Sequence, residues 1–215
     1  HQSIIDCHTH VGISIGNYLA GAYPYAMSVE DIVVRMRHLG ISRSVVFPIE
    51  SSYYIAAGGG SLAGASAFPY EKENISLFKE VFETFPEYTE MLIPFAMFDP
   101  SRKTKEQAGL LDELHREYGV CGLKTVTSYT KAFVKDFQKK GNPIRSFARK
   151  HRLPLTFHCS WLKTDPWANV FDVLDIVREN PELNICVAHS ARFSMKALEI
   201  ADDLPNCFVD SSAFK

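Results

Sequence analysis

Short apolar runs alternate with amphipathic stretches along the whole chain of 215 residues, and this alternation restricts the fold more than any other feature. Most of the runs are rich in Val, Ile and Phe and are continuously apolar, as in strands of a parallel sheet that is covered on both faces. Repeated strand–helix units therefore predict a parallel α/β architecture. The expected strands are Ser3–His8, Ser44–Ile49, Met91–Phe98, Val120–Val126, Leu153–Cys159, Leu183–His189 and Cys207–Asp210.

The stretches between these runs have the pattern of helices, and one of them carries clear boundary signals. Ser28 followed by Glu30 and Asp31 is typical of a helix start, and Gly40 of a helix end. The expected helices are Val29–Leu39, Ile75–Phe85, Thr104–Tyr118, Asn142–His151, Trp167–Glu179 and Met195–Asp202.

The number of strands bears on how the sheet ends. A (β/α)8 TIM barrel needs eight strands and about 250 residues, whereas seven runs are visible here. An open seven-stranded sheet is one alternative, and the other is a barrel without its last strand, which has two unpaired edges that are a liability. We expect residues 1–215 to form a single TIM-barrel domain that is C-terminally incomplete and lacks its last strand–helix unit.

Composition and charge narrow the class of protein. Apolar residues make up 46%, charged residues 22%, and the net charge is −2, as in an ordinary soluble globular protein. So balanced a charge favours neither nucleic acid nor an anionic membrane surface as a partner. No apolar stretch approaches the roughly 20 residues of a spanning helix, and no signal peptide is visible. Five cysteines without a CxxC pair indicate buried free thiols, and hence a cytoplasmic location.

Four histidines lie at the ends of strand-like runs, where parallel α/β folds place their sites. His8 and His10 share one face of a strand, about 6–7 Å apart, so both imidazoles can reach one metal at about 2.1 Å. Two polar strand caps are the alternative. His158 is expected to be a further ligand rather than a core histidine. His189 is either a fourth ligand or a base that holds a metal-bound water; we expect the base, because a catalytic zinc keeps an open position.

Three further ionisable residues are candidates for supporting roles. Lys124 binds a substrate carboxylate, bridges two metals as a carboxylated lysine, or pairs with Glu50. Arg192 holds an anionic substrate group or forms a surface ion pair. Asp6 either orients a metal ligand or satisfies backbone groups in the sheet. We expect Lys124 and Arg192 to bind substrate and Asp6 to support the metal ligands.

These residues carry a resemblance to a known family. Asp6–His10 resembles the DxHxH opening of the amidohydrolase superfamily, and later segments resemble its amidohydrolase-related branch of mononuclear TIM-barrel enzymes. The later segments are Val29–Gly40 with the following Ile41–Pro48, Gly119–Lys124, Leu153–His158, Ala188–His189 and Leu204–Asp210.

The resemblance implies a divalent metal, most often one zinc ion, held by His8, His10 and His158. It also implies that His189 positions or activates the metal-bound water, which hydrolyses an amide, lactone or ester. Some enzymes of the branch instead decarboxylate aromatic or enoic acids. The family's strand-eight aspartate has no counterpart within residues 1–215, because Asp210 belongs to the preceding strand.

Two other kinds of protein stay open as alternatives. A non-catalytic truncated barrel predicts no bound metal, or a metal without turnover. A TatD-like DNase is disfavoured, because Lys124 stands where a carboxylate is expected and no basic stripe is evident. We therefore expect a small-molecule substrate, anionic in view of Lys124 and Arg192, with no nucleic-acid or membrane partner. An exposed sheet edge and the long loop Ser51–Asn74 both favour a homodimer.

Overall fold

A computed structural model describes residues 3–21, 26–49 and 66–212. Contacts divide the chain into two compact units, which are described separately. The first comprises His1–Ala96 and Glu113–Cys121, and the second comprises Met97–Asp112 and Gly122–Lys215. Glu50 and most of the loop Ser51–Asn74 lie outside the described residues. The single domain expected from the sequence stays a prediction.

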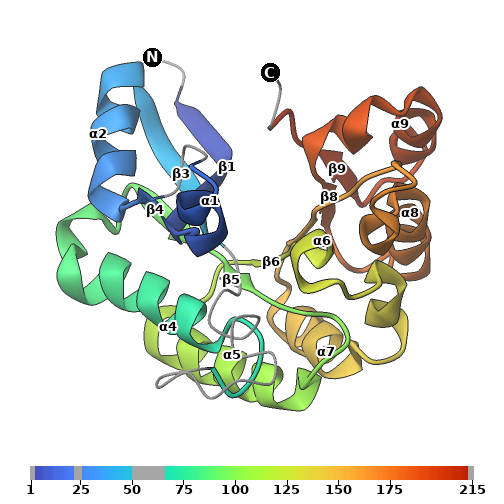
Figure 1. Cartoon of the computed structure of the whole chain (residues 1–215), viewed down its shortest axis with the longest axis horizontal. Coiled ribbons are helices and arrows are strands. Elements are labelled where there is room, and N and C mark those ends of the chain that lie inside the picture. The colour runs from blue at the N-terminus through green and yellow to red at the C-terminus, as the bar shows by residue number, and fades with distance from the viewer. Residues whose placement is uncertain (1–2, 22–25, 50–65, 213–215) are drawn as a thin grey trace. The chain divides into compact units, whose positions relative to one another are not determined.

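The first unit contains a four-stranded sheet with the order β2-β1-β3-β4. Strands β1, β3 and β4 are parallel, and β2 is antiparallel to β1. Helix α2 lies alongside β1 and β3 (Figure 1). The elements of this unit are β1 (Ile4–Ile13), α1 (Ile15–Leu19), β2 (Ala26–Met27), α2 (Val29–Leu39), β3 (Ile41–Pro48), α4 (Glu71–Lys79), the π-helical turn η1 (Glu80–Thr84), the 3-10 turn η2 (Pro86–Tyr88) and β4 (Leu92–Pro94).

Helix α2 shows how local sequence signals and packing agree in this unit. Ser28 and Asp31 form a reciprocal capping box at its start. Gly40 ends the helix in the left-handed conformation, with φ 69°. The apolar face of α2 recurs at helical spacing and packs into one core with residues of β1, β3, α4 and β4. This core contains Val11, Val29, Ile32, Val33, Met36, Val46, Leu77, Val81 and Leu92.

The second sheet has the order β5-β6-β7-β8-β9, and β6 to β9 are parallel. Helices α8 and α9 lie beside β8 and β9 (Figure 1). The elements are β5 (Ala96–Met97, at the boundary of the units), α5 (Thr104–Tyr118, which also crosses it), β6 (Leu123–Thr125), α6 (Thr127–Thr130), η3 (Val134–Gln138), α7 (Asn142–His151), β7 (Leu155–Phe157), η4 (Pro166–Ala168), α8 (Val170–Glu179), β8 (Ile185–Val187), η5 (His189–Phe193), α9 (Met195–Asp202) and β9 (Cys207–Val209).

Aromatic rings fill part of the core of the second unit. Phe157 of β7 packs edge-on against Phe98 and Phe137, with ring centroids 6.0 and 5.3 Å apart. These three side chains are fully buried. Their packing places the end of β7, and with it His158, on a rigid base.

The predicted parallel α/β architecture is confirmed, with differences in the strands. The described residues contain nine strands rather than seven, because β2 is added and the run Met91–Phe98 forms β4 and β5, which belong to different sheets. Strand β1 continues to Ile13, since Gly12 and Ile13 pair with β2. His8 and His10 therefore lie within β1 and not at its end. Within the described residues, every helix is too short or too polar to cross a membrane.

Candidate functional site

The two histidines of β1 lie next to each other in the first unit. The ring centroids of His8 and His10 are 5.4 Å apart, and both rings contact Phe47 of β3. Nδ1 of His10 lies 2.9 Å from the carbonyl oxygen of Pro48. A carbonyl oxygen only accepts, so Nδ1 of His10 carries the proton and Nε2 the lone pair. This tautomer leaves Nε2 as the atom that can bind a cation.

Asp6 supports the backbone beside these rings. Its Oδ1 atom accepts a hydrogen bond from the backbone N–H of His8 at 3.0 Å. Its Oδ2 atom accepts from the hydroxyl of Ser44 at 3.3 Å and from that of Thr9. The pairing of β1 with β3 shifts register between Asp6 and Thr9, so the carboxylate stabilises an irregular piece of strand. Asp6 thus holds the segment that carries His8.

The other two candidate histidines meet in the second unit. His158 follows β7 and His189 follows β8, and these strands are neighbours in the sheet. Nδ1 of His158 lies 2.8 Å from Nε2 of His189, and the ring planes cross at 69°. Only 8% of His189 is exposed. The structure therefore brings these two candidate site residues into contact.

A carboxylate that the sequence analysis did not single out lies beside His158. Oδ2 of Asp165 is 4.0 Å from Nε2 of His158 and accepts a hydrogen bond of 2.6 Å from Ser128. Oδ1 of Asp165 is buried and has no hydrogen-bond partner among the described residues. Imidazole nitrogens and carboxylate oxygens are a suitable donor set for a divalent metal. The His158 side of the candidate site therefore fits a cation, even though Asp165 lies in a connection where no strand-end pattern marks it.

The two cationic residues expected to bind substrate, Lys124 and Arg192, both belong to the second unit. Lys124 of β6 is fully buried, whereas Arg192 of η5 is partly exposed. Burial raises the pKa of the Cys159 thiol to about 12, and the positive charges of Lys124 and Arg192 oppose this rise. Both cations therefore contribute to the electrostatic environment of the Cys159 thiol, and the negative charge of Asp210 acts in the opposite direction. The pairing of Lys124 with Glu50 falls outside the described residues.

The turn that carries His189 and Arg192 has an unusual backbone. All five residues of η5, His189 to Phe193, have positive φ, between 46° and 63°. L-residues other than glycine rarely adopt this conformation, and runs of it are concentrated at functional sites. Asp210 lies beneath the turn, and its Oδ1 atom accepts from the backbone N–H of His189 at 2.9 Å. The sequence places Asp210 only at the end of the last expected strand, so its contact with the His189 segment is a tertiary feature.

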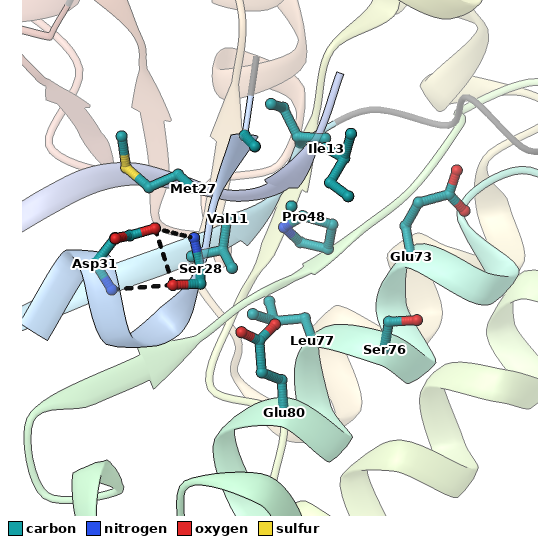
Figure 2. Close-up of a pocket in the computed structure, with 13 residues that line it drawn as sticks. Val11, Ile13, Met27, Ser28, Asp31, Pro48, Glu73, Ser76, Leu77 and Glu80 are labelled. Carbon is teal, nitrogen blue, oxygen red and sulfur yellow. Dashed lines mark hydrogen bonds between the residues drawn. The ribbon is translucent and has the colours of Figure 1, made fainter. Parts of the chain in front are cut away.

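A cavity of about 530 Å³ opens in the first unit. Figure 2 shows the apolar side chains of Val11, Ile13, Met27, Pro48 and Leu77 around it, with the carboxylates of Asp31, Glu73 and Glu80 at its margin. Val11, the residue after His10, is one of the residues that line the cavity. The apolar walls of the cavity suit an apolar group of a ligand, and the carboxylates at its margin disfavour an anionic group in the cavity. The cations Lys124 and Arg192 belong to the other unit.

Comparison with known families decides where this chain belongs. The sequence matches the model of a family described as amidohydrolase over residues 5–215. The chain belongs to the amidohydrolase family. The resemblance carried by Asp6–His10 and the later segments is thereby confirmed. No curated protein sequence matches the chain.

Solved structures similar to this amidohydrolase support the TIM-barrel fold. An uncharacterized TIM-barrel protein from Bordetella bronchiseptica is 16% identical, with a TM-score of 0.67 over 98% of this chain and 75% of that chain. A 5-carboxyvanillate decarboxylase from Sphingomonas paucimobilis is 9% identical, with a TM-score of 0.63 over 94% and 72%. A dihydroxybenzoic acid decarboxylase from Polaromonas sp., solved with manganese and 2-nitroresorcinol, is 12% identical, with a TM-score of 0.61 over 89% and 66%.

Proposed function

We propose that this amidohydrolase is a metal-dependent hydrolase that uses water to cleave a small carbonyl compound such as an amide, lactone or ester. The observation that carries the proposal is the contact between Nδ1 of His158 and Nε2 of His189 at 2.8 Å, in a chain of the amidohydrolase family. A ligand and a base held side by side are what acid–base catalysis next to a metal requires.

Each histidine has a separate part in this proposal. His8, His10 and His158 would hold one zinc ion through ring nitrogens. When bound, such a cation lowers the pKa of a water molecule and polarises the substrate carbonyl. His189 would orient the water and take a proton from it at Nε2, once the hydrogen bond between Nε2 and Nδ1 of His158 opens. Burial of His189 excludes bulk water from this step.

A metal-dependent decarboxylase of a small unsaturated or aromatic acid is the second candidate. The observation that favours it is the presence of two cations in the second unit, the buried Lys124 and the partly exposed Arg192, because cationic side chains suit a carboxylate substrate. The names of two similar solved structures, both decarboxylases, point the same way. In this reaction the same histidines would hold the metal ion, and Lys124 and Arg192 would hold the substrate carboxylate.

Metal content, measured by elemental analysis of the purified protein, tests the proposal first. We expect about one equivalent of zinc in the wild type and in His38→Ala, since His38 is an exposed residue of α2. We expect His8→Ala and His158→Ala to lose it. Absence of metal in the wild type, prepared without chelators, would overturn the proposal and favour a non-catalytic barrel.

Substrate screening then separates the two reactions. Amides, lactones and esters are assayed for carboxylate release, and aromatic and enoic acids for carbon dioxide release. Turnover of the first group that disappears in His158→Ala supports the hydrolase. Turnover of the acids alone overturns hydrolysis in favour of decarboxylation, and zinc without any turnover overturns both.

A further inference from the structure

We propose that Asp210 and Ser212 are a positioning pair that sets the tautomer and the ring orientation of His189. This inference rests on the proposed function, because His189 is the base of that reaction. The inference extends the proposed function by naming the two residues that decide which nitrogen of the His189 ring carries the proton. Both lie just after β9, the strand that pairs with β8 in the same unit.

The hydroxyl of Ser212 links the carboxylate to the ring. Oγ of Ser212 donates to Oδ1 of Asp210 at 2.5 Å. The same Oγ lies 2.8 Å from Nδ1 of His189. A carboxylate only accepts, so it takes the single hydroxyl proton of Ser212, and Oγ then accepts from His189. His189 therefore carries its proton on Nδ1 and a lone pair on Nε2.

This tautomer propagates to the neighbouring histidine. Nε2 of His189, as an acceptor, faces Nδ1 of His158 at 2.8 Å, which must then be the donor. The lone pair of His158 is left on Nε2, the atom beside Asp165. One carboxylate thus directs two rings in series: the base keeps an accepting Nε2, and the proposed metal ligand keeps a coordinating Nε2.

Asp210 also holds the strained backbone under His189. Its Oδ1 atom accepts from the N–H of His189 at 2.9 Å, and its carbonyl oxygen accepts from the N–H and the hydroxyl of Ser190 at 2.7 and 3.1 Å. These bonds stabilise the first two residues of the left-handed turn, which surrounding contacts must impose. Only 4% of Asp210 is exposed, so solvent does not weaken the arrangement.

A role in folding alone makes a different prediction from a positioning role. If Asp210 and Ser212 only cap the end of β9, then removing the Ser212 hydroxyl lowers the melting temperature and leaves the His189 ring unchanged. If they position His189, the ring tautomer changes as well. The test therefore reads the tautomer directly and does not depend on stability or on turnover.

The experiment compares Ser212→Ala, Ser212→Thr and Ser211→Ala in the full chain. Threonine keeps the hydroxyl, and Ser211 is the exposed neighbouring serine. Nitrogen-15 NMR of the imidazoles reports which ring nitrogen is protonated, and the signals of His189 are identified by their loss in His189→Gln. Thermal unfolding and metal content are measured on the same samples.

We expect wild type, Ser212→Thr and Ser211→Ala to show His189 protonated on Nδ1, and Ser212→Ala to lose that preference. With a substrate in hand, kcat of Ser212→Ala falls about 10- to 100-fold with KM little changed, and threonine restores it. An unchanged Nδ1-protonated His189 in folded Ser212→Ala overturns the inference. A shifted tautomer in a protein without turnover supports the positioning pair while it contradicts the proposed function.

Discussion

Nδ1 of His158 lies 2.8 Å from Nε2 of His189, so two imidazoles on adjacent parallel strands share one hydrogen bond. Neighbouring parallel strands that end at the same edge of a sheet bring the residues that follow them close together. The pair divides the proposed work between a ring that holds a cation and a ring that moves a proton.

Replacing His189 by glutamine separates these two tasks. Glutamine keeps a polar side chain but cannot act as a base, so we expect kcat to fall about 10²- to 10⁴-fold. Zinc content should stay at the wild-type level, because His189 is not a ligand in our proposal. The measurement is steady-state kinetics together with elemental analysis. Loss of zinc in His189→Gln would show that His189 is a fourth ligand instead.

Asp6→Asn tests the support of the β1 histidines. The asparagine side chain has one oxygen acceptor in place of two, so it cannot accept from the N–H of His8 and from both hydroxyls as Asp6 does. We expect zinc affinity to fall about 10- to 100-fold, as for other changes behind metal ligands. Competition with a chromogenic chelator measures it. The control is Asp203→Asn, an exposed residue after α9, and equal affinities in both variants would contradict the role of Asp6.

Asn206 is a buried amide that ties the end of α8 to β9. Its Nδ2 atom lies 3.0 to 3.1 Å from the carbonyl oxygens of Val177, Asn180 and Leu183. In Asn206→Asp a carboxylate of the same shape faces three acceptors, so we expect a loss of about 3 kcal/mol in the free energy of unfolding. Urea denaturation measures this loss. The control is Asn184→Asp at an exposed position, which should lower the free energy of unfolding by less than about 0.5 kcal/mol.

The Cys159 thiol predicts an alkaline dependence of stability. Burial raises its pKa to about 12 in the folded state, against about 8.5 in an unfolded chain. Above pH 8.5 the unfolded chain loses this proton and the folded chain keeps it, so stability falls as pH rises toward 12. One thiol can lower the free energy of unfolding by up to about 1.4 kcal/mol for each unit by which the pH rises. Denaturation from pH 8 to 10.5 should show a steeper loss for the wild type than for Cys159→Ala, and parallel curves would contradict the prediction.

The helices show how far local sequence signals reach. Four helices begin and end at the predicted residues, because caps and apolar periodicity are written within each segment. These helices are Val29–Leu39, Thr104–Tyr118, Asn142–His151 and Met195–Asp202. The run Ile75–Phe85 is different. Its helix starts earlier, at Glu71, and its last turn widens into a π-helix from Glu80.

Strand boundaries depended on partners that the pattern does not reveal. Leu153–Cys159 was predicted as one strand, but only Leu155–Phe157 pairs with its neighbours. Strand β1 runs past His10 because β2 pairs with its end. The burial of the cysteines likewise differs from the expectation. Cys159 is buried as expected, whereas Cys7 and Cys121 are exposed, since an apolar run does not say which face is covered.

The sequence by itself determined the parallel α/β class, the amidohydrolase family and the candidate histidines, because apolar periodicity and the DxHxH motif are properties of short segments. Only the tertiary structure decided which polar groups meet. Asp165 stands beside His158, and Asp210 reaches His189 through Ser212, because loops and neighbouring strands bring them together across the fold. The contact between His189 and Ser212, which are 23 positions apart, depends on the pairing of β8 with β9, and no local pattern records that pairing.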